Sequence, residues 1–94
     1  MEAMRAIKID TKDNVAVVLG KVEKGQEVTW TKDGETSSVQ ALDPIPVYHK
    51  IAVRDISAGE PVVKYGEHIG IAAMDIPAGS HVHVHNVRNH REAL

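Results

Sequence analysis

Three of the six histidines alternate with valine in the run His81-Val82-His83-Val84-His85. Successive side chains of a β-strand point to opposite faces, so the run predicts a histidine stripe (His81, His83 and His85) on one face and both valines in the core. Adjacent stripe members would lie ~6.6 Å apart and the outer two ~13 Å apart. A metal ion lies only ~2.1 Å from an imidazole nitrogen. Two adjacent histidines could therefore share one ion, whereas all three could do so only if the strand bends.

Two interpretations of the stripe stay open at this point. The valines could pack the core while the histidines simply face solvent, or the histidines could form a functional face. Solvated strand faces usually carry Thr, Lys or Glu, so three histidines favour ligand or proton chemistry. His49 follows a Pro-rich link and could be aimed from a loop toward the same end of the sheet, although a single loop histidine is more often a spectator.

The other polar candidates carry weaker signals. His68 falls in an expected hairpin turn, and His90 falls in a basic tail, 88–94, that is expected to fray. Asp55 and Asp75 recur at matching turn positions, which indicates capping of backbone amides rather than acid catalysis. The sequence contains no Ser-His-Asp arrangement, phosphate-binding loop or dinucleotide fingerprint.

Length and composition limit what can position these residues. The chain has 94 residues, which predicts a single domain, 1–94, with an ordered core of about 4–87. It has no cysteine, which excludes disulfides and thiolate metal sites, and 11 basic against 13 acidic residues give no footprint for nucleic acid. The longest apolar stretch, 15–20, is too short to span a bilayer, and no signal peptide is evident, so a cytoplasmic protein is expected.

Thirteen Val and eight Ile against three Leu and no Phe predict a mostly β chain. Alternation and turn residues predict strands near 5–9, 16–21, 27–31, 37–41, 51–53, 61–65, 68–73 and 81–87. Lys32-Asp33-Gly34-Glu35 is typical of a hairpin loop. Residues 43–46, with two prolines, predict a stiff extended link, and 47–50 is the best place for a short helical piece.

An internal repeat organises the second half of the chain. Residues 51–62 match residues 71–82 at seven of twelve positions, and a fainter third copy lies at 22–28. Each copy predicts a strand, a tight turn at Gly and a second strand. Three uneven copies are too few for a solenoid, so a compact, folded-over sheet is expected.

Four runs, 13–17, 45–52, 63–70 and 81–87, together resemble the amino-terminal domain of the altronate and galactarate dehydratase family. That domain is of the SAF type, which implies a β-clip fold with short strands and tight turns. The chain is also similar to the small subunit of sulfolactate sulfo-lyase. Tyr48 departs from the pattern, because the family commonly has Gly before the histidine that corresponds to His49; a bulkier residue would shift the loop that presents His49.

The resemblance implies a lyase domain that acts with a large dehydratase-like catalytic subunit and is inactive alone. The implied reaction removes water from a sugar acid of the altronate or galactarate type; the alternative is release of sulfite from sulfolactate. The resemblance also implies roles for individual residues. These are His49, His83 and His85 as catalytic residues, His83 and His85 as metal ligands, and Lys50 and Asn86 as substrate-binding residues. The implied cofactor is a divalent metal, iron or manganese with zinc as an option, held mainly by the partner. The implied substrate is a small anionic hydroxy acid, and a homo-oligomer is possible. An alternative of another class is a non-catalytic SAF-type binding module.

Overall fold

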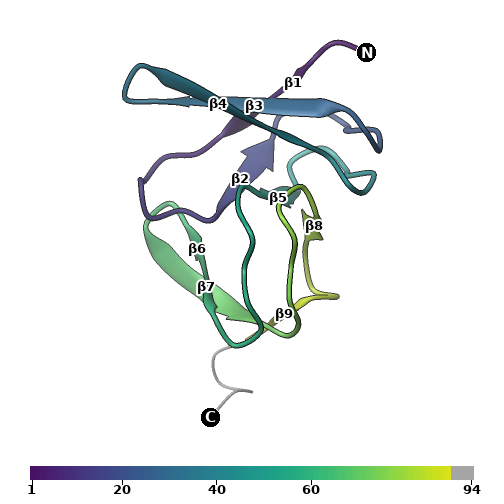
Figure 1. The fold of residues 1–94 in the computed structure, drawn as a ribbon. Coiled ribbons are helices and arrows are strands. Elements are labelled where there is room, and N and C mark those ends of the chain that lie inside the picture. The colour runs from purple at the N-terminus through teal and green to yellow at the C-terminus, as the bar shows by residue number, and fades with distance from the viewer. Residues whose placement is uncertain (90–94) are drawn as a thin grey trace.

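The computed structural model describes residues 1–89, and within them it contains nine strands and no helix. A six-stranded sheet has the order β4-β3-β1-β2-β5-β8, and a three-stranded sheet has the order β6-β7-β9. The pairing of β1 with β3 is parallel and every other pairing is antiparallel. Figure 1 shows the β3–β4 hairpin across one end of the molecule and the β6–β7 hairpin toward the other. The strands are β1 (Met4–Ile7), β2 (Val15–Val18), β3 (Glu27–Lys32), β4 (Glu35–Gln40), β5 (Lys50–Ala52), β6 (Pro61–Lys64), β7 (Glu67–Ala72), β8 (His81–Val82) and β9 (Val87–Arg88).

The mostly β prediction is confirmed, and so are both hairpin turns. Asp33 and Gly34 take positive φ values of 52° and 79°, the backbone that a two-residue hairpin loop needs. Tyr65 and Gly66 do the same between β6 and β7. The expected place of His68 in this turn is wrong, because His68 lies in β7 opposite Val63. The predicted helical piece at 47–50 is wrong: residues 47 and 48 form a turn, and β5 begins at residue 50. No helix able to cross a membrane occurs within residues 1–89.

The repeat is more extensive than the sequence suggests. The same local structure, which we call the clip motif, occurs four times: a strand end, a bend, an isolated apolar bridge residue and a turn closed by a residue with positive φ. The four copies are Val18–Gln26, Ala41–His49, Ala52–Glu60 and Ala72–Ser80. The second copy includes the predicted stiff link, whose Ile45 bridges to Val22. Its positive-φ position is Tyr48, at 66°, where the other copies have Gly.

The clip motifs associate in two reciprocal pairs. In the second pair, the Ile56 N–H donates to the Ile76 carbonyl at 2.8 Å and the Ile76 N–H donates to the Ile56 carbonyl at 2.7 Å. The first pair repeats this exchange between Val22 and Ile45, at 2.8 and 2.9 Å. Figure 1 shows the two loops of the second pair running side by side between β5 and β9.

The predicted capping by the repeated aspartates is confirmed, with an exchange between copies. Asp55 Oδ1 accepts the N–H of Ala78 at 2.8 Å, and Asp75 Oδ1 accepts the N–H of Ala58 at 2.9 Å. Each carboxylate thus caps the turn of the other copy. The bridge residues that these turns flank are 0 to 1% exposed and lie at the centre of two apolar clusters. One cluster contains Val22 and Ile45, and the other contains Ile56 and Ile76.

The predicted strand 81–87 is wrong in its middle. β8 ends at Val82, residues 83–86 form a bend and a turn, and β9 starts at Val87. Val82 is fully buried as predicted, but Val84 is 82% exposed and does not face the core. The cause is Asn86, whose Oδ1 accepts the N–H of His83 at 3.0 Å and whose Nδ2 donates to the His81 carbonyl at 2.9 Å. These two bonds satisfy the backbone locally and end the strand.

The C-terminal boundary also differs slightly from the prediction. β9 includes Arg88, which pairs with Ile71 of β7, so regular structure extends one residue beyond the expected core. The prediction for His90 lies outside the described residues.

Candidate functional site

Three histidines from two parts of the chain meet at one end of the large sheet. His49, His81 and His83, here called the histidine triad, each offer one ring nitrogen, and these nitrogens all lie within 4.8 Å of one another. His49 Nδ1 and His81 Nε2 are 2.9 Å apart, a hydrogen-bond distance. The His49 ring stacks on the His83 ring with centroids 4.2 Å apart. All three side chains are half-buried.

The two clip pairs position the first two members. His49 closes the second clip motif, and its carbonyl accepts the N–H of Val18 at 3.0 Å. His81 directly follows the fourth motif and lies opposite Ile51 in the pairing of β5 with β8. The Asp43 carboxylate accepts the His81 backbone N–H at 2.9 Å, which ties the fourth motif to the second.

The third member is placed by the bend that Asn86 stabilises. An unbroken strand would leave His83 about 6.6 Å further along the edge from His81. The bend instead brings the His83 ring over His49. Asn86, predicted to bind substrate, is 5% exposed, and both polar atoms of its amide bond to the turn that carries His83.

The predicted ligand pair, His83 and His85, is not the group that the structure brings together. His85 is exposed, and its ring lies 5.1 Å from that of His81, outside the triad. His81, which the sequence offers only as one member of the stripe, takes its place. Asn86 is the sequence signal that could have predicted the bend after His81. Asn favours hydrogen bonds from its side chain to the nearby backbone over the hydrogen bonds of a continuing strand.

The surroundings favour uncharged imidazoles. Burial lowers the pKa of His81, with further lowering from His85, His49 and His83, while Asp43 opposes the shift. Burial also lowers the pKa of His83, and the charges of His49, Lys50 and His85 lower it further. A neutral imidazole can accept a proton or bind a metal ion.

One ring nitrogen of His83 has an unmet bonding requirement. His83 Nδ1 is buried and has no hydrogen-bond partner among the described residues. Buried polar atoms in folded proteins nearly always have a partner, so an exception calls for a ligand, an ion or a water at that point.

A cationic pocket opens beside the triad. Lys50 and His83 line an open pocket of about 250 Å³ together with Ile69, Val84, Val87, Arg88 and Asn89. Burial lowers the pKa of the half-buried Lys50, and the positive charge of Lys64 lowers it further. The predicted substrate-binding Lys50 therefore lies next to a predicted catalytic histidine, on a surface suited to an anion.

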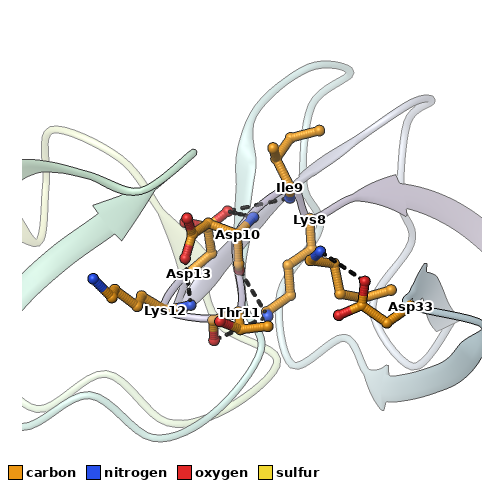
Figure 2. Close-up of polar contacts among 8 residues, drawn as sticks. Lys8, Ile9, Asp10, Thr11, Lys12, Asp13 and Asp33 are labelled. Carbon is orange, nitrogen blue, oxygen red and sulfur yellow. Dashed lines mark hydrogen bonds and ion pairs between the residues drawn. The ribbon is translucent and has the colours of Figure 1, made fainter.

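The run at 13–17 that supports the family resemblance has a structural role. Asp13 Oδ2 accepts the N–H groups of Ile9 at 3.2 Å and Asp10 at 3.0 Å, as Figure 2 shows, and its Oδ1 accepts the N–H of Gly66 at 2.8 Å. Burial alone would raise the pKa of Asp13, but these backbone hydrogen bonds outweigh it and the pKa is lowered. Asp13 thereby ties the chain before β2 to the β6–β7 turn.

Asn14 adds a second tie to the same hairpin. Its side chain is fully buried, with Oδ1 accepting the Val63 N–H at 2.8 Å and Nδ2 donating to the Pro61 carbonyl at 2.9 Å. Asp13 and Asn14 therefore fix the hairpin that carries Lys64, whose charge acts on Lys50.

Comparison with known proteins gives consistent matches. The chain is 44% identical over 85 residues to the (2R)-sulfolactate sulfo-lyase subunit alpha of Chromohalobacter salexigens, covering 87% of this chain and 90% of that protein. It is 44% identical over 91 residues to altronate dehydratase of Escherichia coli, covering 97% of this chain but 18% of that protein. It is 37% identical over 75 residues to galactarate dehydratase of Escherichia coli, covering 79% of this chain and 13% of that protein.

The chain thus spans less than a fifth of either dehydratase and most of the sulfo-lyase subunit. The family model described as the altronate/galactarate dehydratase SAF domain matches residues 4–90, which include every strand described above. The chain therefore belongs to the family of altronate/galactarate dehydratase SAF domains.

Proposed function

We propose that this chain is the SAF-type component of a hydroxy-acid lyase and presents its histidine triad at the edge of an active site that a large dehydratase-type catalytic chain completes. The observation that carries the proposal is the set of three imidazoles within 4.8 Å beside Lys50, on an open pocket rather than an enclosed one. Elimination chemistry needs a site that excludes water, so a second chain or domain must close this one. A cytoplasmic location is part of the proposal.

The proposed reaction is a β-elimination. A base removes the proton on the carbon next to the carboxylate, that electron pair forms a carbon–carbon double bond, and the β hydroxyl leaves as water once it is protonated. The enol product then rearranges to a keto acid. The proton is very weakly acidic, so positive groups must stabilise the charge that develops on the carboxylate.

The residues of this chain suit three of the required tasks. Lys50, with Arg88 on the same pocket, binds the substrate carboxylate. With the triad free of metal, His83 or His49 would donate the proton to the leaving hydroxyl or accept the substrate proton. With an ion bound to the triad, this proton transfer would pass to a residue of the large chain. His85, exposed at the rim, contacts the substrate or the large chain. Asn86 holds the bend on which His83 sits.

The donor set fits the divalent metal that the family implies. The triad supplies three imidazole nitrogens, and the buried His83 Nδ1 lacks a partner within the described residues. A bound divalent ion would supply Lewis-acid stabilisation of the carboxylate. Iron and zinc suit a set of neutral imidazoles, whereas manganese would need additional oxygen ligands from the substrate or the large chain.

The direct test combines the purified chain with the large dehydratase-type chain encoded in the same genome. Altronate and galactarate are supplied with Fe²⁺ or Mn²⁺, and keto-acid formation is measured. We expect the chain alone to be inactive and the mixture to be active. The double variant His83→Gln/His85→Gln should assemble but lose activity, whereas the control His68→Gln should retain it. Full turnover by the assembled double variant would rule out the histidine site, and turnover by the chain alone would rule out the need for a partner.

A second candidate substrate is sulfolactate. It is favoured because the chain covers 90% and 91% of two proteins named as (2R)-sulfolactate sulfo-lyase subunit alpha, the second from Paracoccus pantotrophus. The same proton abstraction would then expel sulfite instead of water. Measuring sulfite in the reconstituted reaction with sulfolactate separates the two candidates.

The competing class is a binding module without catalysis. It predicts that no large dehydratase-type chain is encoded nearby and that no such chain co-purifies with this one. A stable complex that performs the elimination would exclude it.

A further inference from the structure

We infer that the histidine triad is a divalent-metal site built by this chain itself, with His81 as the third ligand beside His49 and His83. The inference deepens the proposed function and rests on it for the purpose of the ion, but metal binding by the chain can be measured without any lyase activity. It differs from the stripe-based prediction by exchanging His85 for His81 and by placing the ion on this chain rather than mainly on a partner.

The spacing of the ligand atoms supports the site. Two nitrogens that bind one ion at ~2.1 Å lie at most ~4.2 Å apart. His49 Nδ1 and His81 Nε2 are 2.9 Å apart and already within that span. The widest separation in the triad is no more than 4.8 Å, so a movement of one ring by at most about 1.4 Å brings the set to the ~3.4 Å spacing of tetrahedral ligands. An ion would replace the proton now shared between His49 and His81.

The unpartnered nitrogen is an independent observation. His83 Nδ1 is buried without a hydrogen-bond partner among residues 1–89, a costly arrangement for a polar atom. Its ring is already stacked against His49, and its backbone N–H is held by Asn86. A metal bond to Nδ1 would satisfy this nitrogen.

Side chains nearby hold the backbone of two of the three ligand residues. Asp43 bonds to the backbone of His81, and Asn86 bonds to the backbone of both His81 and His83. His85 lies exposed on the turn.

The donor set also limits the ion. Three imidazoles without a carboxylate favour Zn²⁺, Fe²⁺, Co²⁺ or Ni²⁺ and disfavour Mg²⁺ and Ca²⁺, which prefer oxygen. Three protein ligands leave at least one coordination position open, as in catalytic rather than structural zinc sites. His83 lines the adjacent pocket together with Lys50, so an anionic substrate in that pocket would lie next to the proposed ion.

The test uses the full chain, freed of metal with a chelator, and titrates it with Co²⁺. We expect one equivalent to bind with visible absorption bands of an imidazole-ligated ion. His49→Gln, His81→Gln and His83→Gln should each weaken binding by more than about 100-fold, beyond the loss typical of outer-shell changes. The matched control is His85→Gln, which removes a histidine of the same stripe and should leave the dissociation constant nearly unchanged. Thermal unfolding of each variant checks that it is folded.

A measurement on the unaltered chain removes dependence on the variants. The ring-nitrogen resonances of His49, His81 and His83 should shift on addition of one equivalent of Zn²⁺, and those of His85 and His68 should not. The inference is overturned if His85→Gln weakens binding as much as His81→Gln does, or if the triple triad variant binds Co²⁺ as tightly as the unaltered chain. Lyase activity in a complex whose small chain binds no metal would overturn this inference and leave the proposed function standing. Metal binding without any elimination activity would overturn the proposed function and leave this inference standing.

Discussion

Replacing Tyr48 by Gly should stabilise the domain. Tyr48 has φ of 66° at the position where the other three clip motifs have Gly25, Gly59 and Gly79. A non-glycine residue in this left-handed conformation costs on the order of 1–3 kcal/mol. Its side chain is 70% exposed, so truncation sacrifices little apolar burial.

The opposing effect is the entropy that glycine adds to the unfolded chain, about 0.5–1 kcal/mol. The difference predicts that Tyr48→Gly raises the free energy of unfolding by about 0–2.5 kcal/mol, with a central value of about 1 kcal/mol, the strain relieved less that entropy. For a domain of this size, 1 kcal/mol corresponds to a shift in Tm of about 4–8 °C. Urea denaturation followed by circular dichroism gives the free energy directly.

Two glycines of the same motif provide controls. At Gly59 an added Cβ meets nothing within 4 Å, so Gly59→Ala should cost the backbone strain of about 1–2 kcal/mol less the entropy of about 0.5–1 kcal/mol that glycine gives the unfolded chain. At Gly79 the same Cβ would collide with the Gln40 carbonyl oxygen, so Gly79→Ala should cost clearly more. If Tyr48→Gly lowers stability while Gly59→Ala is neutral, positive φ is not the factor that distinguishes these positions, and the reasoning fails.

Three further predictions concern the supports of the site. Asp13→Asn should cost about 2–3 kcal/mol at neutral pH, because it replaces a charged acceptor of several backbone N–H groups. Since the folded-state pKa of Asp13 lies below 3.8, its contribution is complete above that pH and disappears as pH falls through the folded pKa. The urea midpoint of the unaltered chain should therefore converge on that of the variant in acid. Asp55→Ala and Asp75→Ala should each cost about 1 kcal/mol and by nearly equal amounts, because each caps the other copy's turn; unequal losses in urea denaturation would argue against the reciprocal pairing. Lys50→Met should tighten Co²⁺ binding by about fivefold, equivalent to about 1 kcal/mol of removed repulsion, and calorimetric titration should show no change if the ion lies elsewhere.

The sequence indicates most strands and turns because these depend on local signals. The Asp33-Gly34 turn and the capping aspartates follow from residue types whose conformational preferences act over a few positions. The second clip motif escapes detection because its bridge residue, Ile45, is flanked by prolines and its turn ends in Tyr48 instead of Gly. Sequence identity is lost there although the hydrogen bonds are the same.

The site could be predicted only in part, for a related reason. Alternation correctly places Val82 in the core, but it assumes that the strand continues. Two hydrogen bonds from Asn86 end the strand after Val82 instead. As a result Val84 is exposed and the His83 ring stacks on His49. The meeting of His49 with His81 depends on contacts between residues more than thirty positions apart, which no local pattern contains.

The pairing of clip motifs has a consequence for how the domain folds. Each pair joins bridge residues only about twenty positions apart, 22 with 45 and 56 with 76, so each can close with a modest loss of chain entropy before the other forms. His49 belongs to the earlier pair and His81 follows the later one, so the triad exists only after the two halves have docked through β2, β5 and β8. A ligand of the triad would bind only the docked state and would therefore slow the separation of the two halves. Hydrogen exchange in β5 and β8 should then report whether the triad is occupied. It should do so more sensitively than hydrogen exchange within either clip pair.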